Sequence, residues 1–198
     1  MKKIFLVITT LAVNIGFGQS WTKKYDHVNE FSCGLALVEK DGKHGFVDES
    51  GKLIVQLKYE DALQFSCGVT AVMLDGKWGY IDSTGKEIVP MKYSDAYSCS
   101  DGLCLVARDG KYGFIDKKGE QVIPLIFEGA DSFTEGLAAV KKKDLWGFID
   151  KKGREVIPFK FNYARAFDNG LAKVMNKSGD WINIDKDGKE VKDDQAKQ

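Results

Sequence analysis

The chain has 198 residues, and its 29 lysines and arginines balance its 29 aspartates and glutamates. A chain with both signs interspersed has no basic stripe to hold a phosphate backbone, so we do not expect a nucleic-acid partner. This length is enough for one sizeable domain.

Residues 1–18 have the pattern of a secretory signal peptide. A short basic start precedes an apolar run, and Gly16 and Gly18 put small residues just before a cleavage site at Gln19. The run is too short and too interrupted for a convincing membrane span, although an uncleaved N-terminal anchor is the alternative. We therefore expect a periplasmic or secreted chain with no membrane span after leader cleavage.

From Gln19 to Val191 the chain is dominated by one block of about 34 residues, written five times. Such self-similarity is typical of an array in which each copy buries its apolar face against its neighbours. We therefore divide the chain into a signal peptide (1–18), a repeat domain (19–191) and a short polar tail (192–198). One glycine of the block marks the period: Gly34, Gly68, Gly102, Gly136 and Gly170.

Each copy predicts three short strands joined by tight turns. A first apolar strand ends at a dipeptide such as Asp41-Gly42, whose positive φ suits a two-residue hairpin. The second strand carries an aromatic residue and a glycine, and the third ends at a proline such as Pro124. A linker with spaced apolar residues then leads to the next copy. We expect an all-β tandem array of three-stranded antiparallel meanders, open, curved and solenoid-like, with a closed five-bladed propeller-like ring as the alternative.

An aspartate begins the second turn of every copy, and a glycine ends it. Both residue types are favoured at these two positions of a type I turn. A calcium ion would need six to eight converging oxygen ligands, whereas here one carboxylate recurs in each copy. We therefore expect turn residues, with no metal and no other cofactor. The turn carboxylates are Asp48, Asp82, Asp116, Asp150 and Asp185.

An aromatic position recurs in the second strand and allows two interpretations. The rings could form an exposed ladder for sugar rings or partner side chains. We favour packing between neighbouring copies, because the position is regular and an adjacent glycine permits close approach. The residues at this position are His44, Trp78, Tyr112, Trp146 and Trp181.

Four cysteines raise the question of disulfides in an exported chain. Cys99 and Cys104 flank a turn and could bridge across it, or they could be small buried apolar residues, since other copies mostly have alanine at the place of Cys104. Cys33 and Cys67 share a repeat position, and a bridge between them depends on how closely the copies stack. No histidine lies near any cysteine in sequence, so we do not expect a catalytic thiol.

The end copies depart from the repeat in the way expected of caps. Lys173 enters the first strand of the last copy, and Ile182-Asn183 replace the glycine and the following aromatic residue. Terminal repeats need a wetter outer face, because no neighbour covers them.

The segments Trp78-Gly79-Tyr80-Ile81-Asp82 and Trp146-Gly147-Phe148-Ile149-Asp150, each followed by a glycine and then by Val-Pro or Ile-Pro, resemble the bacterial WG-repeat family. The resemblance covers residues 25–191. It implies an all-β repeat protein, often exported, with interaction roles and no catalytic residues to transfer.

No nucleophile elbow, phosphate loop or dinucleotide fingerprint is present in the sequence. We therefore expect an exported, non-enzymatic scaffold that binds another macromolecule, in the first instance a protein. The alternative is a lectin-like module that binds envelope polysaccharide through the aromatic ladder. Contact candidates are residues that vary between copies: Lys141, Lys142, Lys143, Lys160, Asn162 and Arg165.

Overall fold

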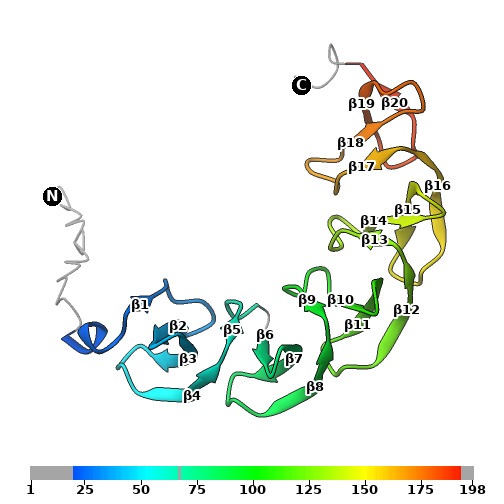
Figure 1. The fold of residues 1–198 in the computed structure, drawn as a ribbon. Helices are drawn as coiled ribbons and strands as arrows, with labels where there is room; N and C mark the ends of the chain where they lie inside the picture. The colour runs from blue at the N-terminus through cyan, green and yellow to red at the C-terminus, as the bar shows by residue number, and fades with distance from the viewer. Residues whose placement is uncertain (1–19, 67, 193–198) are drawn as a thin grey trace, which may run out of the picture.

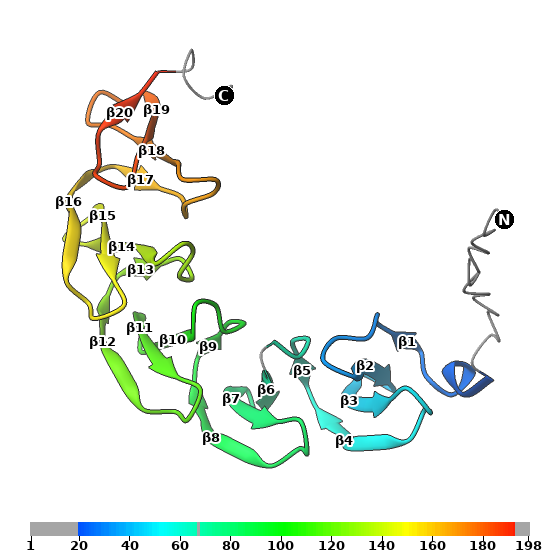
Figure 2. The ribbon, with the colours of Figure 1, turned by 180° about the vertical axis from the view of Figure 1, so that it is seen from behind.

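The fold is a row of five small antiparallel sheets along an open arc (Figure 1). It is seen in a computed structural model that describes residues 20–66 and 68–192. A short 3₁₀ helix, η1 (Ser20–Lys24), precedes the first sheet. The first and last sheets lie far apart at the two ends of the arc, and β20 does not pair with β1 (Figure 2). The predicted open all-β array is therefore confirmed, and the closed ring is not formed.

Each sheet has four strands in chain order. From the N-terminal to the C-terminal end of the arc, the sheets are β1 (His27–Val28), β2 (Leu35–Lys40), β3 (Lys43–Asp48) and β4 (Leu53–Tyr59); β5 (Asp61–Ala62), β6 (Val69–Leu74), β7 (Lys77–Asp82) and β8 (Glu87–Tyr93); β9 (Asp95–Ala96), β10 (Leu103–Arg108), β11 (Lys111–Asp116) and β12 (Gln121–Phe127); β13 (Gly129–Ala130), β14 (Leu137–Lys142), β15 (Leu145–Asp150) and β16 (Glu155–Phe161); β17 (Tyr163–Ala164), β18 (Ala172–Met175), β19 (Trp181–Ile184) and β20 (Glu190–Val191).

The first strand of each sheet is the part that the sequence pattern did not predict. It belongs to the segment expected to be a linker, and it adds a fourth strand to each predicted meander. It is only two residues long, as in β5, where Ala62 pairs with Val72 of β6. Two residues are too few to show the alternation that marks a strand. These short strands lie on the inner side of the arc, and the long strands β4, β8, β12 and β16 lie on its outer side (Figure 1).

The first hairpin of each of the first four copies has the predicted tight turn, whereas the last copy has a five-residue turn between Met175 and Trp181. Asp75 and Gly76 have φ of 51° and 67°, as a type I′ turn requires. The Glu60 carboxylate, which comes from the segment before β5, accepts hydrogen bonds from both of their backbone N–H groups, at 3.1 and 2.9 Å. Glu128 binds the fourth hairpin in the same way. In the second and fourth sheets, a carboxylate just before the first strand therefore stabilises the turn of the first hairpin.

The outer strands continue through the prolines at which we expected them to end. Pro124 lies within β12, which pairs with β11 through a register shift. A proline is tolerated at this edge because no further strand needs its missing N–H. The shifted backbone lies against Gly113: a Cβ at this glycine would be 2.7 Å from the carbonyl oxygens of Ile123 and Pro124. The repeat glycine therefore allows the outer strand of its own sheet to approach closely. It does not make room for a ring of the neighbouring copy, which is what we expected from the sequence.

Aromatic pairs join consecutive sheets along the core. Phe148 of the fourth sheet packs on Phe167, in the loop between β17 and β18 of the last sheet, with ring centroids 4.9 Å apart. Equivalent pairs elsewhere along the arc have centroids 4.7 Å apart. These residues are buried, so each sheet is stabilised mainly by the sheets beside it.

One junction replaces this aromatic pair with a tyrosine and a disulfide. Cys99 stands where the other junctions have phenylalanine, and it is bonded to Cys104, with their Cα atoms 4.0 Å apart. The facing residue is Tyr80, whose hydroxyl donates a hydrogen bond to the Tyr97 carbonyl at 2.7 Å. Burial raises the pKa of Tyr80 far above its usual range, so the hydroxyl stays protonated. Cys33 is exposed and free, and its repeat counterpart Cys67 lies outside the described residues.

The two ends of the arc are built differently. At the N-terminal end Trp21 of η1 is buried against Ala36, Val38 and Val47. Its ring fills the space beside Gly51 in which a preceding sheet would place an outer-strand residue, as Val55 does beside Gly85. In the described part of the chain no helix is long and apolar enough to cross a bilayer, and the expected leader lies outside that part.

Candidate binding surface

The turn carboxylates hold their own turns. Asp82 accepts hydrogen bonds from the backbone N–H groups of Thr84 and Lys86, at 2.9 and 3.1 Å. The Thr84 hydroxyl also donates to Asp82, and this bond is the main reason why the pKa of the carboxyl is lowered. The other four aspartates make the same backbone contacts. Across residues 20–66 and 68–192, no three His, Cys, Asp or Glu side chains are grouped to hold a metal ion.

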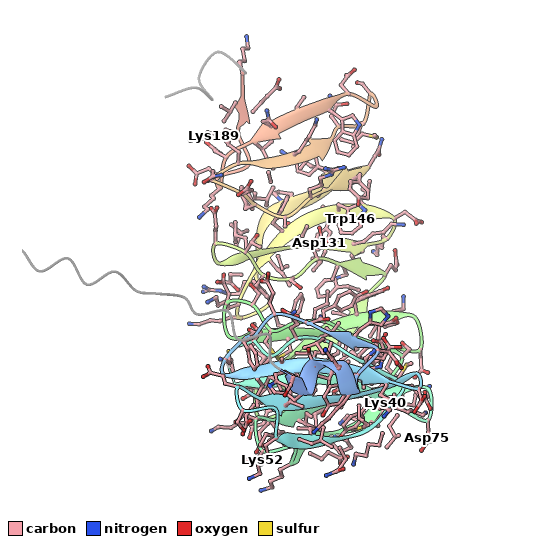
Figure 3. All side chains as sticks on the ribbon, turned by 90° about the vertical axis from the view of Figure 1, so that its left-hand side faces the viewer. Lys40, Lys52, Asp75, Asp131, Trp146 and Lys189 are labelled. Carbon is pink, nitrogen blue, oxygen red and sulfur yellow. A yellow bond between two sulfur atoms is a disulfide. The ribbon has the colours of Figure 1, made fainter. Side chains whose placement is uncertain are left out.

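The repeated aromatic residues are half-buried in the first four sheets and exposed in the last. Trp78 packs at the junction with the third sheet, beside Tyr93 and Ala96, and Tyr112 packs at the next junction. Figure 3 shows Trp146 on the same side of the array as Lys40 and Asp75, opposite Lys52 and Lys189. The side chain at this position is therefore a packing residue wherever another sheet follows.

Trp146, Tyr163 and Trp181 form a continuous row of ring contacts at the C-terminal end. Tyr163 lies between the two tryptophans, with centroid distances of 5.3 Å to Trp146 and 5.7 Å to Trp181. Tyr163 is 43% exposed and Trp181 is 42% exposed, whereas Trp146 is half-buried. We call these three residues the C-terminal aromatic cluster.

Local sequence differences explain why the cluster forms only here. Tyr163 stands at the position that is Gly129 in the fourth sheet and aspartate in the second and third. The Trp146 ring lies over Gly129, where a Cβ would already be 3.4 Å from the ring. Tyr163 then covers this ring from the next sheet and shares a cross-strand row with Met175 and Trp181. No described sheet follows, so Trp181 stays open.

Two cations flank the exposed tryptophan. The Arg165 guanidinium lies 5.9 Å from the centre of the Trp181 ring, and the Lys173 ammonium lies 5.7 Å from it. Both distances fit a cation–π contact. Burial raises the pKa of Asp131, while a hydrogen bond from the Ala166 N–H and the positive charge of Arg165 oppose that rise. The surface therefore combines exposed rings with positive charge.

The surface is hollowed on both sides of β19. One hollow, of about 350 Å³, lies on the uncovered face of the last sheet and is lined by Lys173, Asn183 and Lys192 among others. A second, also of about 350 Å³, is lined by Phe161 of β16 and by Lys177. The two hollows share Ile182 and Glu190.

Among the contact candidates from the sequence, only Arg165 contacts the C-terminal aromatic cluster, through Trp181. The Lys141 ammonium pairs with Asp144 at 3.0 Å, and the Asn162 side chain donates to the Asn176 carbonyl at 3.0 Å. Lys160 lines the second hollow, and Lys142 and Lys143 are exposed at the fourth hairpin. Sequence reasoning missed Tyr163, although its departure from the small or acidic residue of the three preceding copies was visible.

Comparison with known proteins gives a repeat family and a fold. The family model described as WG containing repeat matches residues 21–43, 45–78, 78–112, 112–146 and 146–181. The designed protein Ika8 is similar at 14% identity and a TM-score of 0.52, over 83% of this chain and 60% of that chain. Hsv2 of Kluyveromyces lactis is similar at 12% identity and a TM-score of 0.52, over 80% of this chain and 58% of that chain.

The WD40 β-propeller domain of Doa1 matches at 11% identity over 85% of this chain and 69% of that chain, but its TM-score of 0.43 is too low to carry an argument. The likeness to Ika8 and Hsv2 shows a shared repeat fold alone. This chain spans about 60% of the length of those two proteins. No curated protein sequence matches it.

Proposed function

The chain belongs to the WG containing repeat family, and from that premise we propose that it is an exported, non-enzymatic scaffold that binds a partner protein through the C-terminal aromatic cluster. The single observation that carries the proposal is the grouping of Tyr163, Trp181 and Arg165 on an exposed surface. Tyrosine, tryptophan and arginine are the residue types that contribute most of the binding energy at protein interfaces.

The other parts of the proposal have separate support. Export rests on the signal-peptide pattern of residues 1–18. The absence of catalysis rests on the repeat family and on a sequence without a catalytic motif. Scaffolds of stacked repeats generally act by offering an extended surface.

A capture experiment with matched variants tests the proposal. The purified mature chain is immobilised and exposed to the exported-protein fraction of the source cells, alongside a Tyr163→Ala/Trp181→Ala variant and an Ile126→Ala control. Ile126 is also an exposed apolar side chain, at 51%, but it lies on the outer strand β12. We expect the native chain and the control to retain one partner that the double variant loses. Equal capture by all three proteins would contradict the proposed surface.

A lectin-like module for acidic envelope polysaccharide is the second candidate. The exposed rings of Tyr163 and Trp181 favour it, because sugar rings stack on aromatic faces. Two features weigh against it: these rings are inclined at 69° to each other, and two cations already lie over Trp181. A glycan array separates the candidates, since saturable binding of a polysaccharide that Trp181→Ala abolishes would favour the lectin.

A further inference from the structure

Within the described residues, the outer strand of the last sheet is much shorter than its four counterparts. Strands β4, β8, β12 and β16 each span 7 residues, whereas β20 spans 2. In a complete sheet the end of the outer strand pairs with the repeated aromatic residue, as Phe161 does with Trp146. In the last sheet β20 pairs with Asn183 and Ile184. No described strand pairs with Trp181 on this edge.

The backbone of Trp181 points to this open edge. Along an antiparallel strand the N–H and C=O of every second residue are directed to the same neighbour. The Asp185 N–H donates to the Lys189 carbonyl, on the β20 side, at 2.9 Å. Trp181 lies four residues earlier and therefore directs its N–H and C=O to the same side. An unpaired edge of this kind is a template for another extended chain.

The two hollows border the part of β19 that β20 does not pair with. They share Ile182, which comes just before Asn183, the first residue of β19 that pairs with β20, and Glu190, the first residue of β20. In the fourth sheet the corresponding place is filled by Pro158, Phe159 and Phe161 of β16. In the last sheet, the backbone N–H and C=O of Trp181 are thus not paired with any described strand. The Trp181 side chain lies next to them, and the two hollows lie on either side.

The residues that follow β20 in sequence lack the side chains that fill this place in the other sheets. Asp194 corresponds to Phe159, and Ala196 corresponds to Phe161. In the four complete sheets these two positions are an apolar residue and a buried tyrosine or phenylalanine. A segment with an apolar and an aromatic residue two positions apart therefore fits the place better than residues 193–196.

We propose that an extended segment of the partner protein adds to β19 as an outer strand, pairs with Trp181 and places an aromatic side chain beneath its ring. The proposal rests on the proposed function and specifies how that surface binds. Lys160, Lys173, Lys177 and Lys192 line the two hollows, against the single carboxylate of Glu190. The segment therefore carries acidic residues next to its apolar and aromatic ones.

The segment that completes the fourth sheet supplies the probe. A fluorescein-labelled peptide Glu-Val-Ile-Pro-Phe-Lys-Phe, the sequence of residues 155–161, is titrated with the mature chain and followed by anisotropy. We expect saturable binding that weakens about tenfold or more when the last phenylalanine becomes alanine. Replacing the peptide's lysine by glutamate should tighten binding about threefold at low salt. A peptide that does not bind, or an alanine peptide that binds equally well, overturns the proposal.

A variant that completes its own sheet gives an independent test. The substitutions Asp193→Pro, Asp194→Phe, Gln195→Lys and Ala196→Phe keep Lys192 and copy residues 158–161 of the fourth sheet's outer strand into the tail. This variant should lose peptide binding and melt at a higher temperature, because its own tail now pairs with the edge of β19. A matched variant that also keeps Lys192 and has serine at positions 193–196 should bind as the native chain does. Undiminished peptide binding by the completed variant overturns strand addition.

The same variants separate this proposal from the proposed function. The completed variant and the Tyr163→Ala/Trp181→Ala variant are compared in the capture experiment. If both lose the partner, strand addition is supported. If the double variant loses it and the completed variant keeps it, the surface is correct and strand addition is wrong. If neither loses it, the proposed surface itself is wrong.

Discussion

The first and last described sheets each have one face that no neighbouring sheet covers, and the two faces differ in what lies on them. At the N-terminal end the buried ring of Trp21 covers the first sheet as a preceding copy would. At the C-terminal end the last sheet carries polar side chains where the other sheets are apolar: Lys173 replaces alanine or leucine, and Asn183 replaces an aromatic residue. Within the described residues, Trp21 covers one end and Trp181 stays 42% exposed at the other, so we place the candidate surface at the C-terminal end.

Replacing the two end tryptophans should give the largest contrast. Trp21→Ala removes a buried ring and should lower the free energy of unfolding by about 3–5 kcal/mol. Trp181→Ala removes a ring that is 42% exposed and should cost about 1 kcal/mol or less. Urea unfolding of both variants measures the difference. Similar losses at the two ends would show that the ends are not built differently.

In the complete sheets, the repeat glycine should be needed more than a glycine that meets only a neighbouring ring. Gly113→Ala would push a Cβ to within 2.7 Å of the outer-strand backbone and should cost about 1–3 kcal/mol. Gly129→Ala is the matched control: its Cβ would meet the Trp146 ring at an ordinary 3.4 Å, so a change below about 0.5 kcal/mol is expected. The last sheet has Ile182 at the glycine position, and its described outer strand pairs only with Asn183 and Ile184. Equal melting of both alanine variants would remove this explanation.

Much of this architecture could be predicted because one pattern is written five times. The two turns of each copy, the three longer strands and the open array follow from local residue preferences repeated in register. The short fourth strands could not be predicted from pattern, because β9 has only two residues, Asp95 and Ala96. The contact of Glu60 with the next hairpin also depends on residues 15 and 16 positions away, which no local preference reveals.

The candidate surface was harder to predict, for two reasons. Trp181 shares its repeat position with four packed or half-buried side chains, and only its place in the last sheet exposes it. The function of the glycine next to the aromatic residue was misassigned, since its contact is with an outer strand about ten residues further along the chain. Tyr163 and the shortened β20 both break the repeat, and such breaks mark the surface better than the repeated residues do.

The junction with the disulfide should be less stable than its neighbours once reduced. Cys99→Ala/Cys104→Ala opens a short loop and should lower the free energy of unfolding by about 2 kcal/mol. Cys33→Ala, at an exposed free thiol, should change it by less than about 0.5 kcal/mol. Adding Tyr80→Phe and Cys99→Phe to Cys104→Ala restores the residue pair of the other junctions and should recover part of the loss. Thermal melts with and without reductant measure these effects, and a native chain indifferent to reductant would contradict them.

Lowering the pH should protonate the turn aspartates and lower the free energy of unfolding, by less than the substitutions above. Because hydrogen bonds from Thr84 and two backbone N–H groups lower the pKa of Asp82 in the fold, its ionised form contributes stability above the usual aspartate pKa of about 3.9. That contribution is lost as the pH falls through the lowered folded value. Asp82→Asn should therefore melt below the native chain at pH 7, with the gap closing toward pH 3. A gap that stays constant with pH would show that the carboxylate does not stabilise its turn by its charge.

Backbone hydrogen exchange at equivalent residues tests the central claim most directly. Trp146 and Trp181 occupy the same repeat position, but Trp146 pairs with Phe161 of a complete outer strand and Trp181 has no described partner on that edge. We predict by NMR that the Trp181 amide exchanges orders of magnitude faster than the Trp146 amide in the free chain, and that it becomes protected when the peptide of residues 155–161 is added. A Trp181 amide as protected as that of Trp146 in the free chain would show that the last sheet is already complete.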